Sequence, residues 1–373
     1  MAGRLRWALA GVGIVVVVGA VVAAVVLVAG RSGADADPAQ EARQAADHFL
    51  TTYVQPDGRV VRPDQGGDTV SEGQAYGMLI AAGVGDEARF RAVWDWTRQH
   101  LQRPDRLLAW RWADGAVVDA TPAADADLFA AGALALAGQR FGDRQLVAAA
   151  GELGDAVLAG ETAAVGSWQV LLAGPWAAAE RVVNPSYFAV GLMSRLYDAT
   201  GDQRWQPVAA TARRLLDDLT ATAPSLVPDW AAVAADGSGV TAQPPPSGGE
   251  VTSGFEAGRA YVQLAVDCDA RGPAIAARAW PFLRAEAEGT INGAYHLDGS
   301  PATTATHPLA VVAAAATADA AGDEAAADEL LDRASDLDRR TPTYYGAAWV
   351  AIARLWLDTP DLGGCRSWES LSG

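Results

Sequence analysis

The chain has 373 residues, half of them hydrophobic, and a formal net charge of −17 at pH 7. Such an acidic surface repels the phosphates of DNA and RNA, so the composition disfavours a nucleic-acid-binding protein. Neither the histidines nor the cysteines have metal-ligand spacing, and we expect no metal and no other cofactor. These residues are His48, His100, His296, His307, Cys268 and Cys365.

The N-terminus predicts a membrane anchor. Residues 1–7 carry two arginines, and residues 8–30 form an uncharged apolar run of 23 residues, long enough to cross a bilayer as a helix. The preceding arginines place residues 1–7 in the cytoplasm and the rest of the chain outside the cell. An Ala34–Asp35–Ala36 cleavage site leaves a secreted protein as the alternative, although a signal peptide usually has a shorter apolar core of about 7–15 residues.

After a polar spacer at 31–38, residues 39–360 are predicted to form one helical domain, followed by a tail at 361–373. Apolar residues recur there at three- and four-residue spacing, which predicts twelve helices. These span 39–53, 71–84, 86–102, 124–141, 143–159, 185–199, 204–220, 254–269, 271–286, 305–321, 323–337 and 344–358. Residues 166–176 could form a small hairpin, and no other segment alternates convincingly as a strand does.

Loop lengths indicate how these helices are arranged. Short turns alternate with longer loops, and Gly–Asp pairs such as Gly85–Asp86 mark several joints, as helix ends commonly do. Helical hairpins with this alternation predict an all-α fold, an (α/α)6 barrel of six hairpins. The Pro/Gly/Ser stretch at 243–249 could be an interdomain linker, but we interpret it as a surface loop because the pairing continues beyond it.

Polar and aromatic residues gather where the second helix of each hairpin begins. If these six helices form the inner ring, their N-termini share one mouth, and Glu72, Asp125 and Glu256 face a common cleft. The six stretches are 71–77, 124–128, 184–188, 253–259, 306–308 and 343–345. Beyond Arg31 the chain has 25 basic and 45 acidic residues, a net charge of −20 that suits a neutral or cationic substrate.

Each of these acids also has a purely structural interpretation. Acidic residues are favoured in the first turn of any helix by its dipole, and Ser253 with Glu256 fits a capping box. Gly73 and Gly77 are different, because each lowers helix propensity by about 1 kcal/mol and a cap does not require them. They indicate close packing or close approach of a substrate.

The chain has 13 tryptophans, and eight of them fall into two groups by position. Three lie within predicted helices and are expected in the core: Trp94, Trp96 and Trp356. Five lie in the long loops, where they could stack on flat sugar faces or plug the core beneath the loop: Trp110, Trp112, Trp168, Trp176 and Trp230.

Several of these strings, in this order, resemble glycoside hydrolase family 8, a family of bacterial endoglucanases, xylanases, lichenases and chitosanases. They are Ser71–Glu72–Gly73–Gln74–Ala75–Tyr76–Gly77–Met78, Trp94–Asp95–Trp96, Ala124–Asp125–Ala126–Asp127–Leu128, Asn184–Pro185–Ser186–Tyr187 and Pro228–Asp229–Trp230. The match runs from about residue 38 to residue 358, and the family fold is an (α/α)6 barrel.

The resemblance implies an inverting mechanism with Glu72 as general acid and Asp125 gripping the sugar at the cleavage point. The family base is an Asp in Tyr-Asp-Ala-x-Arg, where this chain has Phe255–Glu256–Ala257–Gly258–Arg259, so Glu256 is the candidate base. Its longer side chain could crowd the attacking water. The resemblance further implies substrate contacts or cleft positions for Tyr76, Asp127, Tyr187, Arg259, Tyr344 and Tyr345.

We therefore expect a monomeric, membrane-anchored endo-acting hydrolase of a β-1,4-glucan or related exopolysaccharide, which could work beside a polysaccharide synthase. A hydrolase of chitosan or xylan is an alternative within the same family. A second class of protein is a glycan-binding protein that has lost its catalytic base. The change from Asp to Glu at position 256 favours this class, whereas the presence of Glu72 and Asp125 argues against it. A polysaccharide lyase is a third, which the acidity of the chain disfavours.

Overall fold

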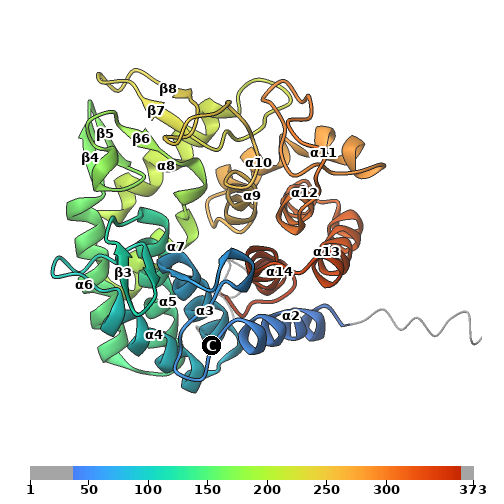
Figure 1. Cartoon of the computed structure of the whole chain (residues 1–373). Coiled ribbons are helices and arrows are strands. Elements are labelled where there is room, and N and C mark those ends of the chain that lie inside the picture. Colours follow the sequence, from blue (N-terminus) through green and yellow to red (C-terminus); the bar gives the residue numbers. More distant parts are fainter. Residues whose placement is uncertain (1–36, 363–373) are drawn as a thin grey trace, which may run out of the picture.

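The computed structural model describes residues 37–362, and helices make up most of them (Figure 1). The predicted membrane span at 8–30 lies outside this range, as do almost all of the spacer and most of the tail. Within residues 37–362, no helix is long and apolar enough to cross a membrane.

The helices follow the predicted order. Up to residue 219 they are α2 (Pro38–Thr52), α3 (Ser71–Val84), α4 (Glu87–His100), α5 (Ala124–Arg140), α6 (Arg144–Gly160), α7 (Val190–Thr200) and α8 (Trp205–Leu219). The later ones are α9 (Gly258–Ala265), α10 (Arg271–Ala277), α11 (Trp280–Ala287), α12 (Pro308–Ala320), α13 (Glu324–Arg340) and α14 (Tyr344–Leu357).

Gly–Asp pairs end one helix and start the next, as predicted. Gly85 ends α3 with a left-handed φ of 77°, which an L side chain rarely adopts. Asp86 then caps α4 by accepting a hydrogen bond of 3.0 Å from the Arg89 N–H. Asp143 caps α6 in the same way, accepting from the Gln145 N–H at 2.8 Å.

The second helices of the predicted hairpins form a closed inner ring. Each contacts the next in the order α3, α5, α7, α9, α12, α14 and back to α3. Nearly every side chain of α3, α5 and α12 is buried, as expected for helices surrounded on all sides. The remaining helices pack outside this ring, and α2 lies beside α14, so the two ends of the described chain meet (Figure 1). This arrangement is that of an (α/α)6 barrel.

Three predicted helices differ from those observed. The segment predicted at 185–199 begins with a short 3-10 turn (Pro185–Tyr187) before α7 starts. The segment predicted at 254–269 is a turn up to Ala257, and only then does α9 begin. The helix predicted at 271–286 is divided into α10 and α11.

Residues 37–362 also form three small antiparallel sheets, so this part of the chain is not purely helical. The hairpin considered at 166–176 is present but begins earlier, because β4 (Thr162–Val165) pairs with β5 (Trp168–Leu171) and β4 lies before the predicted segment. The other strands were not predicted, because two to four residues are too few to display alternation. They form the sheets β1 (Thr69–Val70), β2 (Arg111–Ala113) and β3 (Ala116–Asp119), and β6 (Val182–Val183), β7 (Ala231–Val233) and β8 (Val240–Ala242).

Close packing explains Gly73 and Gly77 in the first two turns of α3. A Cβ atom on Gly73 would lie 2.8 Å from the hydroxyl of Tyr344, and one on Gly77 would lie 2.9 Å from a methyl group of Val60. The Tyr344 ring cannot easily move away, because it is buried and contacts the rings of Phe49 and Tyr53. The expectation of close packing at both positions is therefore confirmed.

The structure also shows the burial of the three helical tryptophans and the chemical state of Cys268. Trp94, Trp96 and Trp356 are buried, as predicted. Cys268 is disulfide-bonded. Cys365, the other cysteine of the chain, lies outside the described residues.

Candidate active site

Three carboxylates meet where the inner helices begin. Glu72 lies in the first turn of α3 and Asp125 in the first turn of α5, while Glu256 lies in the turn just before α9. The start of α3 is fixed from outside the helix, because the Ser71 N–H donates to the Trp110 carbonyl at 2.9 Å. The shared mouth predicted for the inner ring is therefore present.

A buried guanidinium joins these groups. Arg259 is only 2% exposed, and its Nη1 donates to Asp125 Oδ2 at 2.8 Å and to the Tyr76 hydroxyl at 3.0 Å. Its Nη2 donates to Glu256 Oε2, and the guanidinium lies 5.2 Å from the centre of the Tyr187 ring. One cation thus fixes two of the three carboxylates and two tyrosines in a single cluster.

Asn184 gives Glu256 a second contact. Its amide Nδ2 donates to Glu256 Oε2 at 3.1 Å, and its Oδ1 accepts from the N–H and the hydroxyl of Ser186. The Ser186 bonds fix which end of the amide faces Glu256. Both contacts are to the same oxygen, and the Glu256 side chain is 36% exposed. This carboxylate is therefore held firmly and can still meet solvent.

Burial changes the proton affinity of the other two acids. Burial is the largest cause that raises the pKa of Glu72, to about 7, and the negative charge of Asp125 adds to it, while Arg259 opposes it. Burial also raises the pKa of Asp125. The positive charge of Arg259 lowers this pKa, and the negative charge of Glu256 raises it further. Glu72 is thus the acid best placed to hold a proton near neutral pH.

If Glu72 is the general acid that the family resemblance implies, its raised pKa should appear in the pH dependence of hydrolysis. A general acid works only when protonated, so kcat/KM should fall as the pH rises through about 7, the pKa of Glu72. Measuring kcat/KM on a soluble glucan across the neutral range checks this. A decline centred near 4.5, the ordinary value for a glutamic acid, would contradict the prediction.

The capping-box interpretation of Ser253 and Glu256 is wrong. The Ser253 N–H donates to the Tyr295 carbonyl at 2.8 Å rather than to the Glu256 carboxylate. The Glu256 N–H is bound by Asp229, at 3.1 Å, and not by the serine side chain. Glu256 is therefore free of a capping role, and its carboxylate points to Arg259 and Asn184 instead.

The tyrosine pair at the start of α14 lies beside this cluster. The buried Tyr344 hydroxyl makes no hydrogen bond within the described structure and lies over Gly73, next to Glu72. Tyr345 donates from its hydroxyl to the Phe255 carbonyl at 2.9 Å and so contacts the segment that carries Glu256.

Three predicted substrate-binding residues pack against protein instead of joining the cluster. Asp127 is fully buried, and its Oδ1 accepts from the Leu108 N–H at 2.8 Å. Trp168 is buried beneath the Arg214 guanidinium, which lies 4.9 Å from its ring. Trp112 packs edge-on against Trp96 and beneath Arg59. For these two tryptophans the structure fits the alternative of a plug beneath a loop.

The other loop tryptophans remain available to a ligand. Trp110 is 39% exposed and Trp176 is 43% exposed. The Trp230 ring lies between Tyr187 and Trp176, with centroid distances of 6.2 and 6.3 Å. Tyr187, Trp230 and Trp176 therefore form a row of rings that leads away from Arg259, and we call it the aromatic row.

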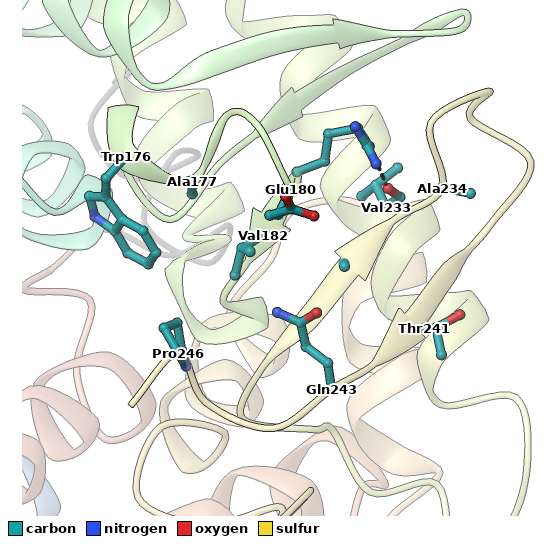
Figure 2. Close-up of a pocket in the computed structure, with 11 residues that line it drawn as sticks. Trp176, Ala177, Glu180, Val182, Val233, Ala234, Thr241, Gln243 and Pro246 are labelled. Carbon is teal, nitrogen blue, oxygen red and sulfur yellow. Dashed lines mark hydrogen bonds between the residues drawn. The ribbon is translucent and has the colours of Figure 1, made fainter. Parts of the chain in front are cut away.

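A cavity of about 560 Å³ lies at the outer end of the aromatic row. Figure 2 shows the Trp176 indole on one side of it and the polar side chains of Glu180, Gln243 and Thr241 along the rest. Its floor includes Val182 and Val233 of the β6–β7–β8 sheet. An apolar floor with a few polar groups suits a sugar, which has both kinds of surface.

Comparison with known proteins decides the family. Residues 20–358 match the family described as glycosyl hydrolases family 8. The chain belongs to glycosyl hydrolases family 8. Its resemblance to this family, inferred from the residues of the inner-helix starts, is therefore confirmed.

Curated and solved members of glycosyl hydrolases family 8 resemble this chain. A probable endoglucanase of Novacetimonas hansenii is 38% identical over 210 residues, 54% of this chain and 61% of that protein. An endoglucanase of Xanthomonas axonopodis pv. citri is 34% identical over 49% of this chain and 50% of its own length. These alignments thus span only about half to three fifths of the relatives. The structure of an endo-β-1,4-glucanase from Acetobacter xylinum is 29% identical, covers 84% of this chain and 97% of that one, and gives a TM-score of 0.72.

Sequence reasoning did not assign roles to Asn184 or Asp229 in the site. Asn184 and Asp229 belong to strings that carry the family resemblance, but a string does not reveal which atom a side chain contacts. Among residues 37–362, no group of three or more His, Cys, Asp or Glu side chains is arranged to hold a metal ion.

Proposed function

We propose that this chain is an endo-acting, inverting glycoside hydrolase of β-1,4-glucan. The observation that carries the proposal is the meeting of Glu72, Asp125 and Glu256 around the buried Arg259 at the mouth of the inner ring. Two carboxyl groups of different proton affinity are what glycoside hydrolysis requires. The names of the relatives, endoglucanases, support the same substrate class.

The proposed reaction uses each carboxyl group once. Glu72 gives its proton to the glycosidic oxygen as the bond from that oxygen to the anomeric carbon breaks. Water attacks the anomeric carbon from the opposite face and loses a proton to Glu256, so configuration inverts. Asp125, held by Arg259 and by the Ala126 N–H at 2.9 Å, is placed to hold the sugar at the point of cleavage.

The aromatic row suits a long, neutral polymer. Flat sugar faces pack on aromatic rings, and the row with its terminal cavity extends the binding surface beyond the carboxylates. A polymer bound on such an extended surface is cut within its length, so we propose endo cleavage.

A panel of polymers tests the proposed activity. Purified protein is incubated with carboxymethylcellulose, lichenan, chitosan and xylan, and both new reducing ends and viscosity are followed. We expect reducing ends from carboxymethylcellulose with an early fall in viscosity, and an α-configured initial product by NMR. Retention on the polymers without any reducing ends would instead identify a glycan-binding protein.

We also propose that the protein is a monomer anchored in the cell membrane with its hydrolase domain outside, where it meets glucan leaving a synthase. The uncharged run at 8–30 supports the anchor. Cell fractionation with N-terminal sequencing tests it, because a mature protein in the medium that starts at Asp37 would refute the anchor. Cross-linking in membranes that contain a glucan synthase tests the partner.

A further inference from the structure

One carboxylate outside the catalytic cluster binds the whole segment that carries Glu256. Oδ1 of Asp229 accepts hydrogen bonds from three successive parts of this segment: the N–H groups of Gly254 at 3.0 Å, Glu256 at 3.1 Å and Ala257 at 2.8 Å. Its Oδ2 accepts from the Thr252 hydroxyl at 2.7 Å. The Asp229 N–H in turn donates to the Thr252 carbonyl at 2.7 Å.

No side chain close in sequence caps the N–H groups of this segment. Residues 254–257 form a turn, α9 begins only at Gly258, and no side chain near the start of α9 caps it. N–H groups ahead of a helix lack partners within the helix and need an acceptor from elsewhere. Asp229, 27 residues away from Glu256 in the sequence, supplies that acceptor for Gly254, Glu256 and Ala257.

Gly254 permits this approach. A Cβ atom there would lie 3.3 Å from Asp229 Oδ2 and 2.8 Å from the Cβ of Ala294. The absence of a side chain at 254 thus lets the turn lie between Asp229 and Ala294. Asp229 is also 9% exposed, so water competes little for its oxygens.

We propose that Asp229 is a positioning residue for the base Glu256. It holds the backbone of Glu256, while Asn184 and Arg259 hold the carboxylate, so both ends of this side chain are fixed. A glutamate has one more rotatable bond than an aspartate, and a fixed backbone limits where its oxygens can reach. The inference rests on the proposed function, because it assumes that Glu256 is the base.

The test compares two variants at Asp229 with a matched control. Asp229→Ala removes all four acceptor contacts, and we expect kcat to fall about 30- to 100-fold, since a displacement of about 1 Å can cost 10²-fold. KM should change less than about threefold, because both oxygens of Asp229 are occupied by donors of the protein itself. Asp229→Asn keeps an oxygen at Oδ1 for the three N–H groups, and we expect kcat within about fivefold of wild type, in line with the weaker bonds of a neutral acceptor.

Asp267→Ala is the control at the other end of α9. Asp267 is also buried and also accepts a backbone hydrogen bond, from the Asp269 N–H, besides its ion pair with Arg213. We expect its loss to lower the melting temperature and leave kcat per folded molecule unchanged. Equal losses of kcat in Asp229→Ala and Asp267→Ala would mean that Asp229 is merely structural, and would overturn the inference.

Two further measurements distinguish failure of the positioning role from failure of the base assignment. If Asp229→Ala does not fold, Asp229→Ser replaces it, and its kcat should lie below that of Asp229→Asn; equal values would overturn the inference. Glu256→Ala is assayed in the same series. Activity in Glu256→Ala would reject the proposed base itself, whereas an inactive Glu256→Ala beside a fully active Asp229→Ala would reject only the positioning role.

Discussion

Glu72→Gln is expected to lower kcat for glucan hydrolysis by about 100-fold or more, while polymer binding stays within a few-fold of wild type. The amide keeps the size of the side chain and some of its hydrogen bonding, but it cannot deliver a proton to the departing oxygen. Glu72 is the acid that burial and Asp125 keep protonated, with a pKa raised to about 7. Steady-state assays on a soluble glucan and binding to insoluble polymer measure the two effects.

Glu87→Gln provides the matched control for Glu72. Glu87 also lies in the first turn of a helix, α4, but it is exposed and paired with Arg91. The same chemical change there should leave both kcat and binding unchanged. A loss of less than about tenfold in Glu72→Gln would remove Glu72 from the role of general acid, because general acids typically contribute about 10²–10⁴.

Glu256→Ala is expected to be nearly inactive, with a loss comparable to that of Glu72→Gln, because no carboxylate would then take the proton of the attacking water. Glu256→Asp should retain or increase activity, since its shorter side chain restores the spacing of the family motif and leaves more room for that water. Rates on soluble glucan, corrected for the folded fraction from thermal melting, compare the variants.

Glu250→Ala is a suitable control, because Glu250 lies in the same loop region but is 78% exposed and contacts only His296 among the ion pairs of the described chain. Its activity should equal that of wild type. Activity of Glu256→Ala within threefold of wild type would end the assignment of Glu256 as base, and Asp125 would be the next carboxylate to test.

The sequence by itself determined most of the helical framework. Apolar spacing and Gly–Asp joints placed α3 and α4 within a residue or two of their observed ends, because both signals depend on neighbours three or four residues apart. The same local patterns located Glu72 and Asp125 at helix starts. The strings around these residues were sufficient to identify the family.

Tertiary structure decided what each of these side chains contacts. Locally, Ser253 and Glu256 satisfy the pattern of a capping box, yet the Glu256 N–H is bound by Asp229 and the Glu256 carboxylate by Arg259 and Asn184. Trp168 and Trp176 were both predicted to lie in loops, but Trp168 is covered by Arg214 and Trp176 borders a cavity. A sequence pattern specifies a residue's own turn of helix. Apart from the contact between Arg259 and Glu256, which are three residues apart, these contacts join segments tens of residues apart. They exist only once the inner ring has closed and brought the helix starts to one mouth.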